Sequence, residues 1–192
     1  MTEALRAKVS IADYLQGELN AGVKHQLVDG EIYAMAGASE AHNTITLNLA
    51  ADLRFKLKGS SCKPFMADMK VHTCGDIYYP DIMVVCQQHD DDTEYVKNAP
   101  TLIVEVLSKS TRAFDHSTKQ TKYLQIPSLE YYVLIEQDYC EVSVLSRAEG
   151  FIPQYYYLGQ EIHFPVLDLT VTVNDIYDGI ENEDMQTYLQ SL

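Results

Sequence analysis

The chain has 192 residues, of which 46% are hydrophobic and 22% are charged, a composition that excludes a disordered or fibrous protein. Its 14 Lys and Arg residues face 28 Asp and Glu residues, so the formal net charge is -14, whereas proteins that bind nucleic acid are usually basic. A chain of this length predicts a single domain spanning residues 1–192.

The sequence indicates a reducing, cytoplasmic setting. No stretch approaches the roughly 20 apolar residues of a membrane helix, and the first residues, MTEALRAKVS, lack the apolar core of a signal peptide. We therefore expect a cytoplasmic protein with no membrane partner. The four cysteines form no CxxC pair, which argues against a zinc or redox motif. We expect all of them to be reduced and mostly buried, with Cys86 a small apolar core residue: Cys62, Cys74, Cys86 and Cys140.

The first part of the chain predicts a short helix followed by a β-hairpin. Ser10 and Asp13 have the spacing of a helix capping box, which indicates a short first helix. Asp29 and Gly30 are flanked by apolar residues, and this pair favours the positive φ angles of a two-residue hairpin turn. Two antiparallel strands should flank the turn.

A long helix is predicted next. Ser39 can cap its start, and Gly59 can end it. Apolar residues recur four apart on one face of this helix: Ile45, Leu49 and Leu53. His42, near the start, shares that face.

The remaining elements predict a sheet covered by helices. Five segments rich in Val, Ile and Tyr are bounded by turn residues and predict strands: 62–73, 77–86, 102–107, 130–136 and 140–146. A further helix is expected at 117–125, because Pro127 cannot continue it. The order indicates an α/β fold in which helices flank a central mixed β-sheet, preceded by an N-terminal helix and a β-hairpin.

Two carboxylates interrupt otherwise apolar strands. Asp81 is the only charge in YYPDIMVVC, and Glu105 is the only charge in TLIVEVLS. Burial of an ionised carboxylate is costly unless it is ion-paired, hydrogen-bonded or bound to a cation. Each residue alone is explained equally well by an ordinary ion pair. If the strands are neighbours, however, both carboxylates can converge on one hard cation such as Mg²⁺ or Mn²⁺.

A positive side chain for the same site must come from another element. Leu107 faces the same side of its strand as Glu105 but carries no amine. Lys119 and Lys122 lie on the following helix, and Lys119 shares a helical face with Tyr123. A solvated helix face is the usual explanation for such lysines. The residues alone leave the choice between the two lysines open.

These segments together resemble a known family. In chain order they are VDGEIY, SEAHN, YYPDIMVV, PTLIVEVLSKST, Asp115, Lys119 with Tyr123, and LEYYVLI. The set resembles the Uma-type family of restriction-endonuclease-like proteins in the PD-(D/E)XK nuclease superfamily. The resemblance implies a restriction-endonuclease-like three-layer core, with Asp81 and Glu105 as the two acids. It also implies that Lys119 is the family's lysine, which has moved from the strand to the helix.

Several positions suggest accessory roles or depart from the family. Gln26 stands where the family commonly has a glutamate, so it offers no anionic metal ligand. Asp115 matches a family position, and we expect it to cap the lysine-bearing helix rather than to act in the site. His42 matches the family's recurrent histidine, and an equally good explanation is a local hydrogen bond at the helix start. The accessory candidates are therefore His42, Asp115, Lys122, Tyr123 and Gln26.

The function implied by the resemblance is a divalent-metal-dependent endonuclease that hydrolyses phosphodiester bonds in DNA. Asp81 and Glu105 would bind Mg²⁺ or Mn²⁺, and Lys119 would stabilise developing negative charge. The net charge and Gln26 motivate an alternative, a catalytically silent nucleic-acid-binding or assembly module on the same fold. A homodimer that uses the tyrosines at 155–157 is a further possibility, although a strand with alternating exposure explains them more simply.

Overall fold

The protein is described from a computed structural model. The structure describes residues 8–35, 37–87 and 91–191. Within these ranges, every helix is too short or too polar to cross a membrane.

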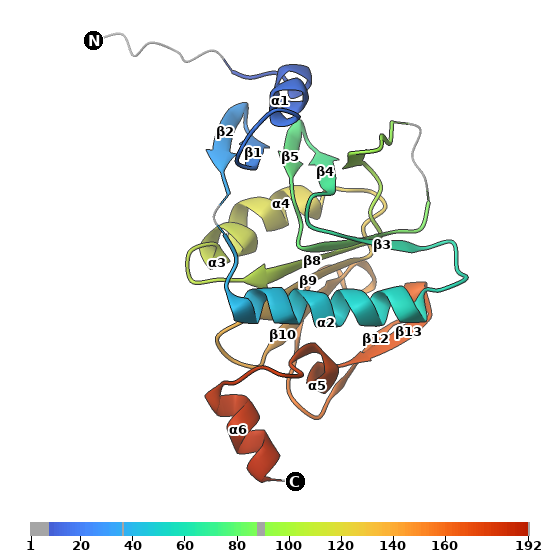
Figure 1. Ribbon diagram of the computed structural model, residues 1–192. Coiled ribbons are helices and arrows are strands. Elements are labelled where there is room, and N and C mark those ends of the chain that lie inside the picture. Colours follow the sequence, from blue (N-terminus) through green and yellow to red (C-terminus); the bar gives the residue numbers. More distant parts are fainter. Residues whose placement is uncertain (1–7, 36, 88–90, 192) are drawn as a thin grey trace.

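A six-stranded mixed sheet forms the centre of the molecule (Figure 1). Its strands, in spatial order, are β11 (Pro153–Tyr156), β10 (Val142–Ser146), β9 (Tyr131–Glu136), β8 (Leu102–Leu107), β6 (Ile82–Val85) and β3 (Lys63–Met66). Strands β8 and β9 run parallel, and the other neighbouring pairs are antiparallel. Every residue of β6, β8 and β9 is buried, which explains why these strands are almost entirely apolar.

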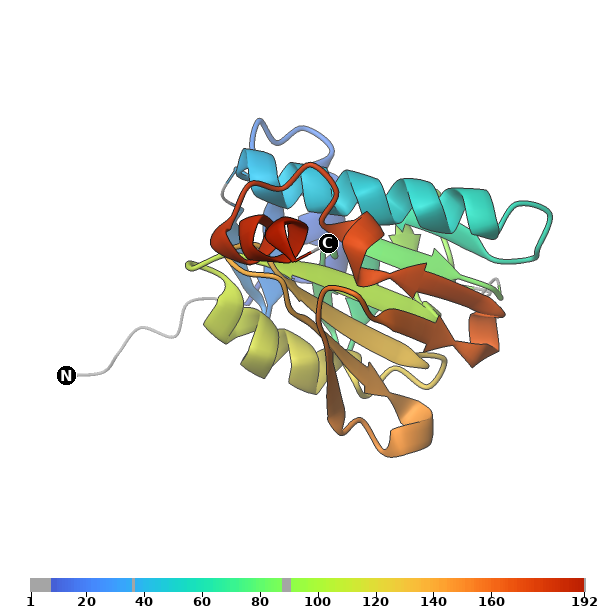
Figure 2. The same ribbon diagram turned by 90° about the horizontal axis from the view of Figure 1, so that it is seen from below.

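Helices cover both faces of this sheet and give the predicted three layers (Figure 2). One face is covered by α2 (Glu40–Lys56), whose Ile45, Leu49 and Leu53 are buried in one core with residues of β6 and β8. Each such side chain contributes about 1.5–3 kcal/mol by its removal from water. The other face carries a continuous helical segment with three parts: α3 (Arg112–Phe114), the π-helical turn η1 (Asp115–Lys119) and α4 (Gln120–Tyr123).

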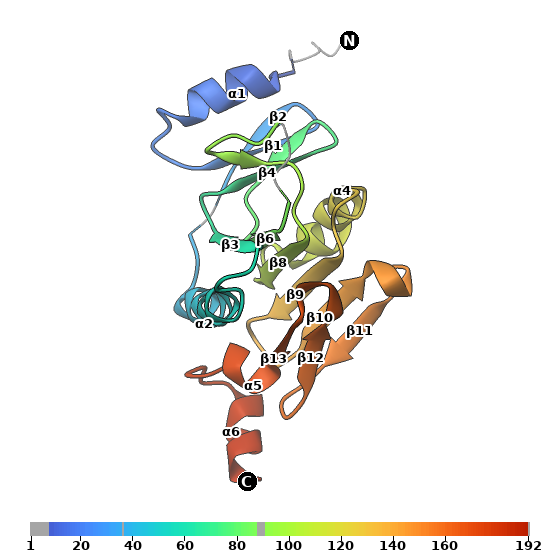
Figure 3. The ribbon, with the colours of Figure 1, turned by 90° about the vertical axis from the view of Figure 1, so that its right-hand side faces the viewer.

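A second sheet of five strands lies beside the central one (Figure 1). Its strands, in spatial order, are β2 (Glu31–Ala34), β1 (His25–Val28), β5 (Asp76–Tyr78), β4 (Lys70–Thr73) and β7 (Val96–Lys97). One face of this sheet contributes Val28, Val71 and Tyr78 to the core shared with α4. The other face is covered by α1 (Ile11–Glu18), so this sheet separates α1 from the central sheet (Figure 3).

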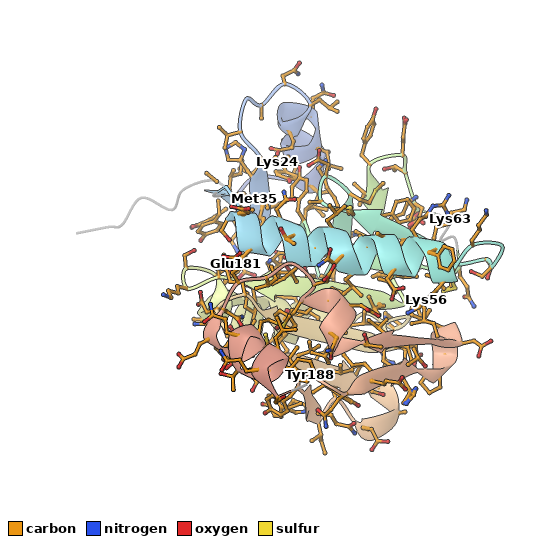
Figure 4. The ribbon with its side chains drawn as sticks, turned by 60° about the horizontal axis from the view of Figure 1, so that its bottom comes forward. Lys24, Met35, Lys56, Lys63, Glu181 and Tyr188 are labelled. Carbon is orange, nitrogen blue, oxygen red and sulfur yellow. A yellow bond between two sulfur atoms is a disulfide. The ribbon has the colours of Figure 1, made fainter. Side chains whose placement is uncertain are left out.

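The C-terminal part packs near α2 and ends in a helix far from α1 (Figure 3). Its elements are η2 (Arg147–Glu149), β12 (Glu161–Phe164), η3 (Pro165–Leu167), β13 (Leu169–Thr172), α5 (Val173–Ile176) and α6 (Glu183–Gln190). Lys56 Nζ, at the end of α2, donates to the Thr170 carbonyl at 2.6 Å and so ties α2 to β13. Figure 4 shows Lys56 and Lys63 at one end of α2 and Met35 at the other.

The predicted helix starts and the hairpin turn are confirmed. Ser10 and Ser39 are the N-caps of α1 and α2, and each side chain accepts a backbone N–H at 3.1 Å. Asp29 and Gly30 have φ angles of 50° and 82°, as a tight hairpin turn requires. Local sequence signals were sufficient here because each depends on only a few neighbouring residues.

The prediction of two long strands at 62–73 and 77–86 is wrong. Each segment forms two short strands, one in each sheet. Strands β3 and β6 belong to the central sheet, whereas β4 and β5 belong to the second sheet. Asp68 has a φ of 94° and separates β3 from β4. Pro80, which has no N–H to donate to a sheet, separates β5 from β6. The second interruption places Asp81 at the entry of β6.

The prediction that all four cysteines are reduced is also wrong. Cys62 and Cys86 form a disulfide. The register that pairs Lys63 with Val85 brings these cysteines together, one residue beyond each strand end. Cys86 is therefore bonded and only partly buried, whereas the free cysteines are the exposed Cys74 and the buried Cys140.

Candidate active site

Asp81 and Glu105 meet across two neighbouring strands. The antiparallel register pairs Ile82 with Val104, so Asp81 lies opposite Glu105. Glu105 is 2% exposed and faces the helical segment, because Leu107, two residues on, packs in that core. Asp81 differs from the prediction, since it occupies the bend before β6 and its side chain is 18% exposed. The pair therefore combines a buried carboxylate with an accessible one.

Lys119 and Tyr123 reach Glu105 from the helical segment. Lys119 Nζ lies 3.0 Å from Glu105 Oε2, and the Tyr123 hydroxyl donates to Glu105 Oε1 at 3.0 Å. The two residues are four apart, so one face of the segment engages both oxygens of the carboxylate. The predicted meeting of Glu105 with Lys119 is present in the structure.

The π-helical turn η1 brings Asp115 into the same cluster. Asp115 Oδ1 lies 2.9 Å from Lys119 Nζ, and both residues are buried. The prediction that Asp115 caps this helix is wrong, because helical structure begins at Arg112 and Asp115 lies inside it. Turns of this kind are rare and occur frequently at functional sites. Lys119 is thus shared between two carboxylates.

His42 contacts Asp81 from the helix on the opposite face of the sheet. His42 Nε2 lies 3.2 Å from Asp81 Oδ2, and the backbone N–H of Val106 donates to the same oxygen at 2.7 Å. Burial acts to lower the pKa of His42, but the hydrogen bond and charge of Asp81 outweigh it and raise the pKa. His42 therefore holds a proton more readily than an ordinary histidine and orients Asp81.

Carboxyl groups outnumber basic side chains in this cluster. Burial raises the pKa of Glu105 well above its usual value, and the charge of Lys119 opposes that shift. Burial acts to lower the pKa of Lys119, but Glu105 and Asp115 outweigh it and raise the pKa, so Lys119 is an ammonium. With Asp81 included, three carboxyl groups lie around the Lys119 ammonium and the His42 imidazole, and a further cation beside Glu105 would stabilise its ionised form.

Lys122 makes a different contact from Lys119. Its Nζ lies 2.8 Å from Asp76 Oδ2 and 3.1 Å from Asp29 Oδ1. Asp76 is buried and also accepts the backbone N–H of Asp29 at 2.7 Å. These contacts fasten the hairpin turn to α4. Of the two candidate lysines, only Lys119 is ion-paired with Glu105 among the described residues.

Gln26 lies on β1, and its side-chain carbonyl accepts no hydrogen bond among the described residues. Its Oε1 atom is buried and has no partner in the part of the chain that the structure describes. Gln26 precedes Val28 by two residues on β1, and Val28 packs in one core with Tyr123. Gln26 is therefore a neutral acceptor on the side of the second sheet that faces the helical segment.

Two contributors to the cluster were missed in the sequence. The buried Tyr132 donates from its hydroxyl to the Asp115 carbonyl at 3.0 Å, and its ring packs edge-on against Tyr123. The sequence did contain a signal for Tyr132, because alternation along the strand at 130–136 places Tyr132 and Leu134 on one face of the sheet. The N–H of Val106 had no such signal, because almost every residue carries one.

The oxygen donors suit a hard divalent cation. Mg²⁺ is usually held by one or two carboxylates, with waters and substrate phosphates completing its coordination. Asp81 and Glu105 supply carboxyl oxygens at opposing positions, and a cation between them would stabilise the ionised form of Glu105. Across residues 8–35, 37–87 and 91–191, no three or more His, Cys, Asp and Glu side chains are grouped to hold a metal. A metal bound here would therefore need oxygen from water or from a substrate.

Comparisons with known proteins agree with this architecture. The mixed sheet with helices on both faces is the α/β fold predicted from the sequence. The model of the Uma2 family, described as "Putative restriction endonuclease", matches residues 11–174, and the chain belongs to this family. The family predicted from the sequence is thus confirmed.

Relatives and a solved structure extend the comparison. "Uncharacterized protein slr1290" of Synechocystis is 30% identical over 177 residues, which cover 90% of this chain and 93% of the relative. "Uncharacterized protein sll1609" of the same organism is 36% identical over 141 residues, covering 71% and 80%. A crystal structure described as a "putative nuclease belonging to DUF820" from Anabaena variabilis superimposes with a TM-score of 0.70 at 13% identity, covering 90% of this chain and 99% of the other. The last similarity supports the predicted fold.

Proposed function

We propose that the protein is a divalent-metal-dependent endonuclease that hydrolyses phosphodiester bonds in DNA. The observation that carries the proposal is the convergence of Asp81, at the entry of β6, with Glu105 of β8 and Lys119 of η1. Membership in the Uma2 family supports the reaction class. Because fold alone does not fix activity, the chemistry of this cluster has to account for the reaction.

Asp81 and Glu105 would hold the metal ion, Mg²⁺ or Mn²⁺. When bound, such an ion polarises a phosphodiester and lowers the pKa of an attacking water. His42 and the Val106 N–H fix the orientation of Asp81 through its Oδ2 atom. Tyr123 similarly fixes Glu105 through Oε1. Oriented ligands reduce the reorganisation needed when metal and substrate arrive.

Lys119 would stabilise negative charge on the reacting phosphate. Its pKa is raised by Glu105 and Asp115, which favours a permanent ammonium over a general base. Lys119 Nζ would contact a phosphate oxygen, and its ion pair with Asp115 would keep the side chain in position.

Comparing two lysine variants tests this role. Cleavage of supercoiled plasmid is measured with Mg²⁺ or Mn²⁺ for the natural protein, Lys119→Met and Lys122→Met. Lys119→Met should lower the cleavage rate by about 100-fold or more, the usual loss when a charge-stabilising group is removed. Lys122→Met is the matched control, because it lies on the same helical segment but pairs with Asp76, and it should retain activity. Equal rates for Lys119→Met and the natural protein would refute the assignment.

A second candidate function is a nucleic-acid-binding module without catalysis. The neutral Gln26 favours it, because an amide carbonyl at this position is not an anionic metal ligand. Titration calorimetry distinguishes the two candidates, since the nuclease must take up Mg²⁺ or Mn²⁺ and the silent module need not. DNA binding without metal uptake would support the module.

A further inference from the structure

A pocket between α1 and the second sheet contains a buried lysine, far from the cluster of Asp81 and Glu105. The pocket has a volume of about 280 Å³, near the lower end of roughly 300–1,000 Å³ for small-molecule sites. One wall comes from α1 and the other from β4, β7 and the segment before β7. Its lining residues are Ala12, Leu15, Gln16, Leu19, Lys70, Thr93, Tyr95 and Val96.

Lys70 is the cation of this pocket. The residue is 8% exposed, and its Nζ lies 4.9 Å from the ring centroid of Tyr79 and 6.0 Å from that of Tyr95. Strand alternation places Lys70 on the α1 face, because Val71 points into the opposite core. Burial lowers the pKa of Lys70, although the charge of Glu18 opposes this shift. The Lys70 ammonium is therefore poorly solvated.

Lys70 has no carboxylate partner of its own. Among the described residues, its Nζ takes part in no ion pair. The nearby Glu18 is already occupied, since it accepts from the Tyr79 hydroxyl at 3.0 Å and from the His25 backbone N–H at 2.9 Å. Asp68, the other nearby acid, pairs with Lys24. A buried ammonium without a counterion is costly, so an anion that enters the pocket would be stabilised.

A second donor lies in the same pocket. Thr93 Oγ1 accepts the backbone N–H groups of Tyr95 and Val96 at 3.2 and 3.1 Å. Because its acceptor sites are used in this way, its own proton is left to donate. Lys70 and Thr93 thus offer a charged and a neutral donor, whereas Leu15, Leu19 and Val96 offer apolar surface.

We propose that this pocket binds a small carboxylate that carries an apolar body. The carboxylate would contact the Lys70 ammonium and the Thr93 hydroxyl, and the apolar body would lie against Leu15 and Leu19 of α1. This pocket is separate from the proposed nuclease centre, so the proposed binding does not depend on catalysis.

Nuclear magnetic resonance titration of the ¹⁵N-labelled full chain tests the proposal with three probes. Hexanoate carries both parts of the expected ligand, acetate only the carboxylate and hexan-1-ol only the apolar body. Hexanoate should give saturable shifts of the amides of Leu15, Gln16, Thr93 and Val96, at concentrations at least about tenfold below those needed for the other probes. Absence of saturable shifts with hexanoate, or equal binding of hexan-1-ol, would overturn the proposal.

Variants assign the binding to these residues. Lys70→Met should weaken hexanoate binding by about tenfold or more, whereas Lys24→Met, a nearby exposed lysine already paired with Asp68, should leave it unchanged. Leu19→Asp covers the case in which Lys70→Met does not fold, because Leu19 is 61% exposed and tolerates a charge. It should also weaken hexanoate binding through repulsion. Unchanged binding in Lys70→Met or in Leu19→Asp would contradict the proposed site.

Discussion

Lys119 connects the two acids of the central cluster that are most deeply buried. Its Nζ lies 3.0 Å from Glu105 and 2.9 Å from Asp115, so one ammonium compensates two carboxylates. Removal of one partner from such a buried set generally costs about 3–5 kcal/mol, because the remaining charge stays buried without compensation. Glu105 and Lys119 therefore stabilise the fold as well as the proposed chemistry. Activity losses in their variants must be compared with folding.

The interaction of His42 with Asp81 predicts a pH dependence of stability. The pKa of His42 is raised in the folded protein, so its stabilisation is full below the unfolded value of about 6.5 and is lost as pH rises through the folded value. In the presence of a chelator, His42→Asn should reduce the free energy of unfolding by about 1 kcal/mol near pH 6 and by less near pH 9.

Urea denaturation at the two pH values measures this difference. His163→Asn is the matched control, because His163 is an exposed histidine of β12 and should show little loss at either pH. A cost of His42→Asn that grows with pH would contradict the assigned ion pair.

The two site lysines show what the sequence could and could not predict. Asp81 and Glu105 were identifiable because each is a lone charge in an apolar segment, and strand pairing then placed them together. The helix periodicity did not choose between Lys119 and Lys122, and the choice depended on the family resemblance. The π-helical turn, which had no local signal, sets the direction of Lys119 and moves Asp115 from a cap position into the cluster.

At the scale of elements, short-range signals predicted structure better than long-range ones. The caps of α1 and α2 and the hairpin turn depend on neighbouring residues and were predicted correctly. The division of 62–73 and 77–86 between two sheets depends on pairing with distant strands, and β-propensity contains no information about it. The disulfide likewise arises from the pairing of β3 with β6.

Thiol titration tests the arrangement of the cysteines. In the native protein under non-reducing conditions, one thiol, Cys74, should react rapidly with a disulfide reagent. Cys140 should react only on unfolding, because it is buried and burial raises its pKa. Prior reduction of the unfolded chain should expose all four thiols. Four reactive thiols in unfolded, unreduced protein would contradict the disulfide between Cys62 and Cys86.

At the scale of the whole molecule, acidic residues outnumber basic ones, and ion pairs neutralise several of the basic side chains near the proposed site. Residues 101–125 carry a local excess of basic side chains, but three of them are ion-paired: Arg112 with Glu136, Lys119 with Glu105, and Lys122 with Asp76. A protein with a net charge of -14 gains little from the counterion release that usually drives DNA binding.

This charge balance predicts that DNA binding depends on divalent metal. Fluorescence anisotropy of a labelled DNA duplex should show weak binding in a chelator and clear binding after addition of Mg²⁺ or Mn²⁺. Use of the Lys119→Met variant, which should cleave slowly, would keep the DNA intact during the measurement. Equal binding with and without metal would favour the catalytically silent module.

The homodimer predicted to use the tyrosines at 155–157 can be tested by sedimentation of the protein. Tyr155 and Tyr157 are 51% and 49% exposed, whereas Tyr156 packs against the core, which is the alternation expected of a strand. A dimer formed through this edge should dissociate when both exposed residues are replaced by serine. A monomeric sedimentation profile of the natural protein would contradict the predicted homodimer.

Uptake of Mn²⁺ by the pair Asp81 and Glu105 tests the central claim most directly. Isothermal titration calorimetry on the natural protein should show binding, and Asp81→Asn and Glu105→Gln should each weaken it by about tenfold or more, since each removes an anionic ligand. Asp76→Asn, which removes a buried carboxylate outside the cluster, should leave it unchanged once folding is verified. Uptake that is absent in the natural protein, or equally tight in Asp81→Asn and Glu105→Gln, would contradict a metal-dependent nuclease centre at this site.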